Sequence, residues 1–236
     1  MIDLFASFKP ASAASTECPA GTFPLENQMH ATDKAKAKLR AMRKKFIHAR
    51  NCEPIISTLP EEEGDQLHCI VGGNFIFGDL IAMICQRTPC KKVWAATLSM
   101  SLKNIESLVS CIEQREIESL ELLVSHFFVN GNPVEREKLQ NARENLGVER
   151  LRLGVARNHA KVTLIDQGTR KLVILSSANY RSSDNIEDIA IHCDSDLYEF
   201  HRAWIEKLIL TSTEKNRSQV EESATQIAKR AKKEGA

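Results

Sequence analysis

Residues 67–115, LHCIVGGNFIFGDLIAMICQRTPCKKVWAATLSMSLKNIESLVSCIEQR, indicate the fold class, because apolar runs of strand length alternate in them with amphipathic stretches of helical period. The pattern predicts strands over 67–71 and 92–99 and helices over 78–87 and 102–115. Strands that alternate with helices are typical of a sheet whose faces are covered by those helices. The first expectation is therefore an α/β fold.

The alternation continues toward the C-terminus and then changes into a run of strands. A strand over 120–128 precedes a helix over 133–145, which has Pro133 in its first turn. Four further strands and a closing helix are predicted at residues 150–156, 160–165, 172–176, 189–193 and 198–210. Strand–helix repeats followed by several strands predict a mixed (α+β) central sheet with helices on both faces.

The chain around this core divides by composition. Residues 66–210 form the predicted domain, and residues 211–236 are a charged tail. Residues 1–65 are an N-terminal extension, with a basic helix predicted over about 31–50 and an acidic linker after it. The Lys and Arg residues of this helix form either a solvated surface or a contact with a phosphate backbone.

Charge and cysteine content limit the kinds of binding partner and the cellular locations that can be expected. The 236 residues hold 32 Lys and Arg against 31 Asp and Glu, so any contact with a polyanion must come from a local cluster of charge. The seven cysteines include no C-x-x-C pair, which predicts reduced thiols and a cytoplasmic location. No export signal or bilayer-length apolar run is found in the sequence, so stable membrane association is not expected.

The residues that could carry chemistry include one H-x-K triplet, in the stretch NHAKVTLID at 158–166. Residues two apart project to the same face of a strand, so His159 and Lys161 are expected side by side. Asp166, at an odd separation, points the other way and is expected to have a structural role. An H-x-K triplet alone is a weak motif, and its meaning depends on what accompanies it.

Two polar segments follow the triplet, SSAN at 176–179 and DNIE at 184–187. If they lie on neighbouring strands, they bring a hydroxyl, a carboxamide and a carboxylate toward the strand ends that carry His159 and Lys161. Such an edge would offer a phosphate group several hydrogen-bond donors.

The segment from His159 to Glu187 resembles the phospholipase D superfamily, whose signature is H-x-K-x4-D followed by G-S-x-N and a downstream N-x-E. The matching residues are His159, Lys161 and Asp166, then Ser177 and Asn179, then Asn185 and Glu187. Ser176 stands where the family has glycine, which adds a side chain beside the site. The resemblance implies a phospholipase D-like fold for residues 67–210.

The resemblance also implies a reaction: metal-independent hydrolysis of a phosphodiester through a phosphohistidine, with no cofactor. His159 would be the nucleophile, with Glu187 or Ser177 fixing its ring, while Lys161 and Asn179 hold the non-bridging phosphate oxygens. The sequence contains no H-E-x-x-H and no zinc-type Cys/His spacing, so no metal site is expected.

In this family a second histidine protonates the leaving oxygen, yet the chain has one H-x-K. The most similar second triplet, His48-Ala49-Arg50, has arginine in place of lysine and lies in the predicted basic helix. The resemblance to single-motif members therefore implies a two-fold homodimer, with His159 of each subunit on either side of the axis. Ordinary hydrogen-bonded positions are expected for four other histidines, His68, His126, His192 and His201.

Three functions stay open at this point: a DNA or RNA nuclease, a lipid phosphodiesterase, and a nucleic-acid-binding protein that has lost catalysis. A nuclease would neutralise backbone phosphates with the basic helix or with arginines near the motif, namely Arg143, Arg150, Arg152 and Arg157. A lipid enzyme would need an aromatic-rich rim, and the chain has 2 Trp and 2 Tyr. The nuclease is the favoured prediction.

Overall fold

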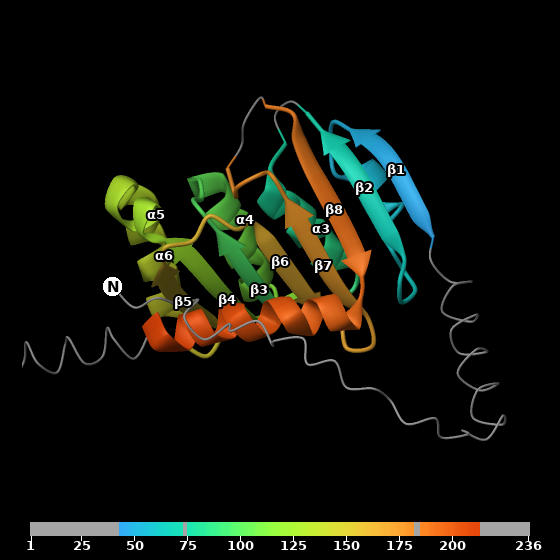
Figure 1. The fold of residues 1–236 in the computed structure, drawn as a ribbon. Helices are drawn as coiled ribbons and strands as arrows, with labels where there is room; N and C mark the ends of the chain where they lie inside the picture. Colours follow the sequence, from blue (N-terminus) through green and yellow to red (C-terminus); the bar gives the residue numbers. More distant parts are fainter. Residues whose placement is uncertain (1–42, 73–74, 182–184, 213–236) are drawn as a thin grey trace, which may run out of the picture. The chain divides into compact units, whose positions relative to one another are not determined.

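The computed structural model describes residues 43–72, 75–181 and 185–212. The strands of this part form one eight-stranded sheet in the order β1-β2-β8-β7-β6-β3-β4-β5 (Figure 1). Their bounds are β1 Lys44–Ala49, β2 Gln66–Val71, β3 Cys90–Thr97, β4 Ile117–Ser125, β5 Leu151–Ala156, β6 Val162–Asp166, β7 Lys171–Ser176 and β8 Glu187–Cys193. The pairs β1–β2, β3–β4 and β4–β5 are parallel and the other neighbours are antiparallel, which confirms a mixed sheet.

Helices cover both faces of this sheet, as predicted. The helices are α2 Glu53–Ile56, α3 Phe77–Arg87, α4 Leu102–Glu113, α5 His126–Gly131, α6 Pro133–Leu146 and a C-terminal helix that begins at residue 195 and continues to the end of the described part at 212. Figure 1 shows α3 and α4 behind the sheet and the C-terminal helix, in orange and red, in front of it. Strand β3 is buried on both sides, which explains its continuous apolar run.

Two hydrophobic cores result, one on each face. The larger core packs α3, α4 and α6 against the sheet through residues such as Leu80, Ile105 and Leu139. The smaller core packs Tyr198 and Ile205 of the C-terminal helix against Trp94, Leu123, Leu164 and Val173 of the strands. Both faces of the sheet are therefore shielded from solvent by packed helices where these cores lie.

Gly154 in β5 allows the C-terminal helix to approach the sheet closely. A Cβ at this position would lie 2.7 Å from the Cα of Ile209, a distance that real Cβ atoms do not tolerate. One turn later, the hydroxyl of Ser212 accepts a hydrogen bond of 2.9 Å from the backbone N–H of Val155. The helix thus belongs to the domain beyond the predicted end at residue 210.

The prediction of a basic helix over residues 31–50 is wrong for its last part, and residues 31–42 lie outside the described residues. Lys44–Ala49 form β1, which pairs in parallel with β2. Phe46, Ile47 and His48 suit a strand, and lysines are common on edge strands because they discourage further pairing. Pairing with a distant strand has overridden the local helical propensity.

The acidic segment predicted as a linker packs against the domain. Ile55 in α2 and Leu59 after it are buried in the larger core. The carboxylate of Asp65 accepts a hydrogen bond of 3.0 Å from the backbone N–H of Arg43, and Gly64 donates one of 2.7 Å to the carbonyl of Cys193. The sheet and its core thus include residues well before position 66.

The chain leaves β4 earlier than predicted. The strand expected over 120–128 ends at Ser125, and residues from His126 onward form α5. The hydroxyl of Ser125 accepts a hydrogen bond of 3.0 Å from the backbone N–H of Phe128, which caps the new helix. An apolar run that crosses a strand–helix boundary cannot be divided by hydrophobicity alone.

All six cysteines in the described part are free and buried. Burial raises the pKa of the thiols of Cys52, Cys69 and Cys111 to about 12, so these thiols stay protonated near neutral pH. They behave as small apolar core residues. The cytoplasmic location that the cysteines predicted stays a prediction.

Candidate active site

The residues singled out around the H-x-K triplet, apart from Asp166, come together where several strands begin or end, at the upper edge of the sheet in Figure 1. Strand β6 runs antiparallel to β3 and β7, and β8 runs antiparallel to β7. The start of β6, the end of β7 and the start of β8 therefore meet, with Val162 opposite Leu175 and Ser176 opposite Ile189. Three segments separated in the sequence thus share one short stretch of edge.

His159 and Lys161 lie side by side in the connection that enters β6, as expected. The Lys161 Nζ lies 3.2 Å from the His159 Nδ1 and donates a hydrogen bond of 3.0 Å to the backbone carbonyl of His159. The imidazole is exposed and the lysine is half-buried. The ammonium thus contacts the ring nitrogen directly.

Asn158, which the sequence reasoning missed, fixes the backbone around His159. Its side-chain amide donates a hydrogen bond of 3.2 Å to the carbonyl of Thr97 at the end of β3, and its Oδ1 accepts one of 2.9 Å from Ala160 N–H. The residue is buried. A buried Asn beside an exposed imidazole is typical of a positioning residue, and the asparagine next to the motif was the available signal.

Ser177 and Glu187 form a second polar pair at this edge. The hydroxyl of Ser177 donates a short hydrogen bond to the carboxylate of Glu187 and accepts one of 2.9 Å from the backbone N–H of Asp188. The Ser177 N–H donates to the Asp188 carbonyl at 3.0 Å. The carboxylate at the start of β8 is therefore tied to the end of β7.

Ser176, in the place of the family glycine, is bonded to nearby backbone. Its hydroxyl donates to the carbonyl of Asp188 at 3.1 Å and accepts from the N–H of Ala178 at 2.8 Å. The added side chain therefore helps to hold the turn after β7 against β8.

Asn179 presents a carboxamide that lacks a complete set of partners. Its Oδ1 is buried without a hydrogen-bond partner within the described part of the chain. A buried polar atom left unpaired costs about 1 to 3 kcal/mol, so such atoms often await a ligand. The oxygen and nitrogen of an amide are assigned from their neighbours, and turning the group by 180° would direct its NH2 donors there instead.

Tyr180 anchors the segment that carries Asn179. Its hydroxyl lies 2.6 Å from the Thr163 hydroxyl, and its backbone carbonyl accepts a hydrogen bond of 2.8 Å from Ser101 N–H. The ring packs edge-on against Phe77 at 4.8 Å between centroids. Burial raises the pKa of the phenol above its ordinary value of 10, so the group remains a neutral structural element.

Asp166 lies at the opposite end of β6, away from His159. Its carboxylate forms an ion pair of 2.5 Å with Lys171 and accepts a hydrogen bond of 2.8 Å from Gly168 N–H. Gly168 has a φ of 79°, which a glycine adopts without strain in this hairpin turn. Asp166 therefore holds the β6–β7 turn.

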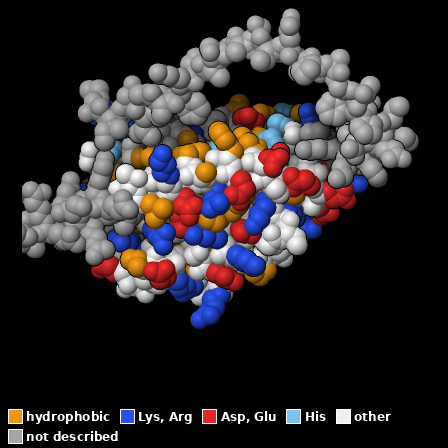
Figure 2. Space-filling model, turned by 60° about the horizontal axis from the view of Figure 1, so that its bottom comes forward, with side chains coloured by type: hydrophobic (Ala, Val, Ile, Leu, Met, Phe, Trp, Pro, Cys, Tyr) orange, Lys and Arg blue, Asp and Glu red, His pale blue; other side chains and the backbone are white. Residues whose placement is uncertain are grey.

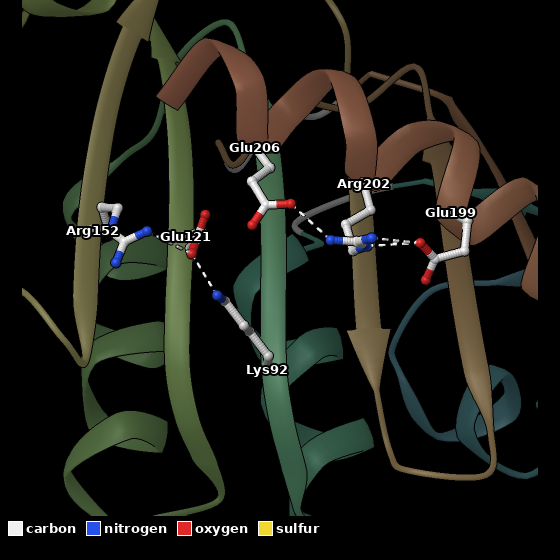
Figure 3. A network of polar contacts seen from close by, with 6 residues as sticks. All are labelled: Lys92, Glu121, Arg152, Glu199, Arg202 and Glu206. Atoms are coloured by element: carbon white, nitrogen blue, oxygen red, sulfur yellow. Dashed lines mark hydrogen bonds and ion pairs between the residues drawn. The ribbon is translucent and has the colours of Figure 1, made fainter. Parts of the chain in front are cut away.

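Of the four arginines considered for phosphate binding, Arg157 alone follows a strand at the site's edge, where it is exposed. Arg150 precedes β5 at the opposite edge and donates to the carbonyl of Ile112. Arg152 points onto the sheet face, where Figure 3 shows it beside Glu121 and Lys92, at 3.2 Å from the glutamate oxygen. Arg143 lies in the last turn of α6. The expectation that all four lie near the site is therefore wrong.

The other histidines occupy varied positions. His126 begins α5 and is exposed at the same edge as the site. His201 accepts a hydrogen bond of 3.1 Å from the indole N–H of Trp204, while His68 and His192 contact each other through their rings at 5.9 Å. Burial, and after it the neighbouring imidazole, lowers the pKa of His192 and of His201.

Neither a metal cluster nor a membrane-crossing helix is found in the part of the chain that the structure describes. No group of three or more His, Cys, Asp or Glu there is arranged to hold a metal ion. No helix among the same residues has both the length and the apolar character to cross a bilayer.

Comparison with known proteins finds similarity in structure. No protein-family model and no curated protein sequence matches the chain. Nuc from Salmonella typhimurium, a phospholipase D family member, is 16% identical over 55% of this chain and 85% of its own, with a TM-score of 0.44. NucT from Helicobacter pylori is 17% identical over 57% and 87%, with a TM-score of 0.41. TrmBL2, an archaeal chromatin protein described as binding DNA, is 13% identical over 77% and 62%, with a TM-score of 0.42.

The fold is similar to that of solved phospholipase D family members. Matches at this level of identity and overlap carry no activity or partner across to this chain. Its function has to be argued from the residues at the sheet edge.

Proposed function

We propose that this protein hydrolyses phosphodiester bonds in nucleic acids, with His159 as the nucleophile. The observation that carries the proposal is the exposed imidazole of His159 in contact with the Lys161 ammonium, at the edge that also holds Asn179 and the Ser177–Glu187 pair. A phosphate oxygen entering this edge would draw the ammonium away from the ring nitrogen. The freed imidazole could then attack the phosphorus.

The chemistry needs two imidazoles. Attack by His159 forms an N–P bond and breaks the P–O bond to the leaving alcohol, whose oxygen takes a proton from the partner subunit's His159. The same partner imidazole then removes a proton from water, the water oxygen attacks phosphorus, and the N–P bond breaks. Lys161 and Asn179 stabilise the charge on the non-bridging oxygens throughout. A two-fold homodimer supplies the second imidazole at the exposed edge.

Positive charge at this edge supports a nucleic acid as the substrate. Four cationic side chains lie at the strand ends around the site, Arg50, Arg157, Lys161 and Arg181. They would neutralise successive phosphates without reading sequence. Exposed Phe127 and Ile186 at the same edge favour a lipid phosphodiester as the second candidate.

The test is hydrolysis in the presence of EDTA of labelled single- and double-stranded DNA and RNA, of a short-chain phosphatidyl substrate, and of the small diester bis(p-nitrophenyl) phosphate. We expect nucleic acid and small diester to be cleaved. His159→Ala should abolish cleavage with little change in stability, because the side chain is exposed. Lys161→Ala should lose most of the turnover through weaker transition-state binding. Undiminished turnover by His159→Ala would reject His159 as the nucleophile.

The dimer has a separate test, in which native and His159→Ala chains are refolded together in equal amounts. If both imidazoles serve one phosphorus, hybrids are inactive. After random reassortment about a quarter of the dimers are native, so the mixture should show about a quarter of the activity of native protein at the same total concentration. Retention of half the activity, or full specific activity from a monomer in sedimentation, would contradict a shared site.

A further inference from the structure

Three strands at one end of the sheet carry aromatic and imidazole rings on one face, where His201 of the C-terminal helix lies close enough to His192 to act on its charge. Phe46 of β1, His68 of β2 and His192 of β8, here called the ring strip, lie on the face that the C-terminal helix covers farther along the sheet. The helix packs on Val173, Leu164, Trp94 and Leu123, which belong to β7, β6, β3 and β4.

Phe46 is the solvent-exposed ring of the strip, and the two imidazoles beside it are half-buried. Phe46 is 74% exposed, and its ring lies nearly parallel to that of His68, with 5.5 Å between centroids and 19° between planes. His68 in turn meets His192 edge-on at 5.9 Å. In Figure 2 a group of hydrophobic side chains with neighbouring histidines lies above an area in which acidic and basic side chains are mixed. An exposed aromatic ring offers a flat face on which another ring can stack.

The strip leads to the candidate active site. One row of paired residues runs from Phe46 through His68, Ala190 and Leu175 to Val162, a buried residue of the smaller core that directly follows Lys161. At a strand spacing of about 4.8 Å this row is about 19 Å long, a distance that a few nucleotides can span. The strip and the candidate site could therefore engage one ligand.

A pocket of about 620 Å³ opens at the ends of β1 and β2, beside the segment that enters β8. Its lining includes His48, Arg50, Ile70 and Ile186, which offer apolar surface with an imidazole and a guanidinium. Ile186 directly precedes Glu187 of the polar pair at the site. The pocket thus continues the path from the rings to the reacting groups.

Charge favours a polyanion on this surface. Lys44 of β1 and Arg50 directly after β1 fall on the same strand face as Phe46, whereas Arg43 and Lys45 alternate to the opposite face. No carboxylate of the described residues forms an ion pair with Lys44 or Arg50. Two acids of the described residues lie near the strip: Asp188, which pairs with Ile70, and Asp194, whose charge acts on His192. Flat rings flanked by cations match unpaired bases on a charged backbone, whereas a duplex buries the base faces that would stack.

We propose that the ring strip binds unpaired nucleotides of a single-stranded nucleic acid and directs the strand to the edge that carries His159. This inference rests on the proposed function for its direction toward the site, and it names the substrate class as single-stranded. Phe46 supplies the stacking surface, His68 supports its ring, and Lys44 and Arg50 neutralise the phosphates.

The experiment measures binding of a fluorescent single-stranded oligonucleotide and of the matching duplex by anisotropy. The full chain carries His159→Ala so that cleavage does not interfere. Adding Phe46→Leu, which keeps apolar bulk but removes the π-face, should weaken single-strand binding about fivefold or more and change duplex binding little. Phe46→Trp should preserve or strengthen binding. Val148→Ala, at an apolar residue 50% exposed between α6 and β5 and at the opposite end of the strands from the site, is the control and should bind as the parent does.

Small-diester hydrolysis separates this inference from the proposed function. With His159 restored, Phe46→Leu should hydrolyse bis(p-nitrophenyl) phosphate at the native rate while its KM for the oligonucleotide rises. If no diester is hydrolysed yet Phe46→Leu still weakens single-strand binding, the proposed function fails and the strip stands.

Other outcomes would overturn the strip. If Phe46→Leu binds the single strand as tightly as the parent, or loses the same affinity for single strand and duplex, the ring strip is not a stacking surface for unpaired bases. A shift from dimer to monomer on Phe46→Leu in sedimentation would make this face a contact between copies of the chain. If the protein binds anionic vesicles but no oligonucleotide, and Phe46→Leu weakens the vesicle binding, the ring strip would be a lipid contact.

Discussion

At the scale of single residues, the candidate site depends on side chains that fix the backbone around the reacting groups. Asn158 links the His159 segment to the end of β3, and Tyr180 links the Asn179 segment to β6 through Thr163. Both are buried, whereas His159 and Ser177 are exposed. The exposed groups are thus held by neighbours that could not be recognised as functional from residue type alone.

Asn158→Ala should lower kcat for bis(p-nitrophenyl) phosphate by tenfold or more, on the order expected for a misplaced catalytic group. The change leaves the Thr97 carbonyl and the Ala160 N–H without their partner. KM should change little, because the substituted side chain does not touch phosphate. Steady-state kinetics checks this, and Asn158→Asp, which keeps the acceptor for Ala160 but turns a carboxylate oxygen toward the Thr97 carbonyl, should also lower kcat. A rise in KM alone would contradict a positioning role.

Asn179→Leu should abolish turnover while the free energy of unfolding stays level or rises by about 1 kcal/mol, because it removes a buried oxygen that has no partner in the described residues. Urea unfolding and the small-diester assay measure the two effects. Asn141→Leu on the exposed side of α6 serves as the control and should change neither. A variant that is both active and less stable would show that the carboxamide is structural.

At the scale of elements, the C-terminal helix and the strands beneath it are joined by packing, with charged groups in between. Figure 3 shows Glu121 of β4 between Lys92 and Arg152, and Arg202 of the C-terminal helix between Glu199 and Glu206. Glu121 is 3% exposed at its side chain, whereas Glu199 is 55% exposed. The two groups therefore differ in how strongly solvent screens them.

Glu121→Ala should lower the free energy of unfolding by about 2 to 4 kcal/mol, because it leaves two cations partly buried without their carboxylate. Glu199→Ala, which breaks a solvent-exposed pair, should cost less than about 1 kcal/mol. Urea unfolding of both variants gives the comparison. Equal losses would show that burial does not distinguish the two pairs.

At the scale of the whole molecule, stability should depend on pH through the half-buried histidines. The folded-state pKa values of His192 and His201 lie below the ordinary 6.5, chiefly because of burial. Below pH 6.5 the unfolded chain therefore binds more protons than the folded chain, so acid favours unfolding. Stability from these groups is complete above about pH 6.5 and declines as the pH falls toward the lowered values.

Urea unfolding at pH 7.5 and pH 5.5 should give a lower free energy of unfolding at pH 5.5. The double variant His192→Gln and His201→Gln should show a smaller difference between the two pH values. His126→Gln, at an exposed histidine, is the control and should leave the native difference unchanged. A pH dependence of the same size in the double variant would assign the effect to other groups.

The sequence by itself determined the local features of this protein. Apolar periodicity predicted most strands and helices of the domain, because burial of one face or both leaves a regular pattern in the chain. The side-by-side placement of His159 and Lys161 was expected from their separation by two residues next to a predicted strand.

Only the tertiary structure decided which distant segments meet. Strand order brought Ser177, Asn179 and Glu187 to the edge that carries His159, and it drew Lys44–Ala49 into the sheet although their composition favoured a helix. It also took Arg150 and Arg152 away from that edge. The physical reason is that strand pairing and register are set by the faces that distant segments bury together, and no local propensity encodes that choice.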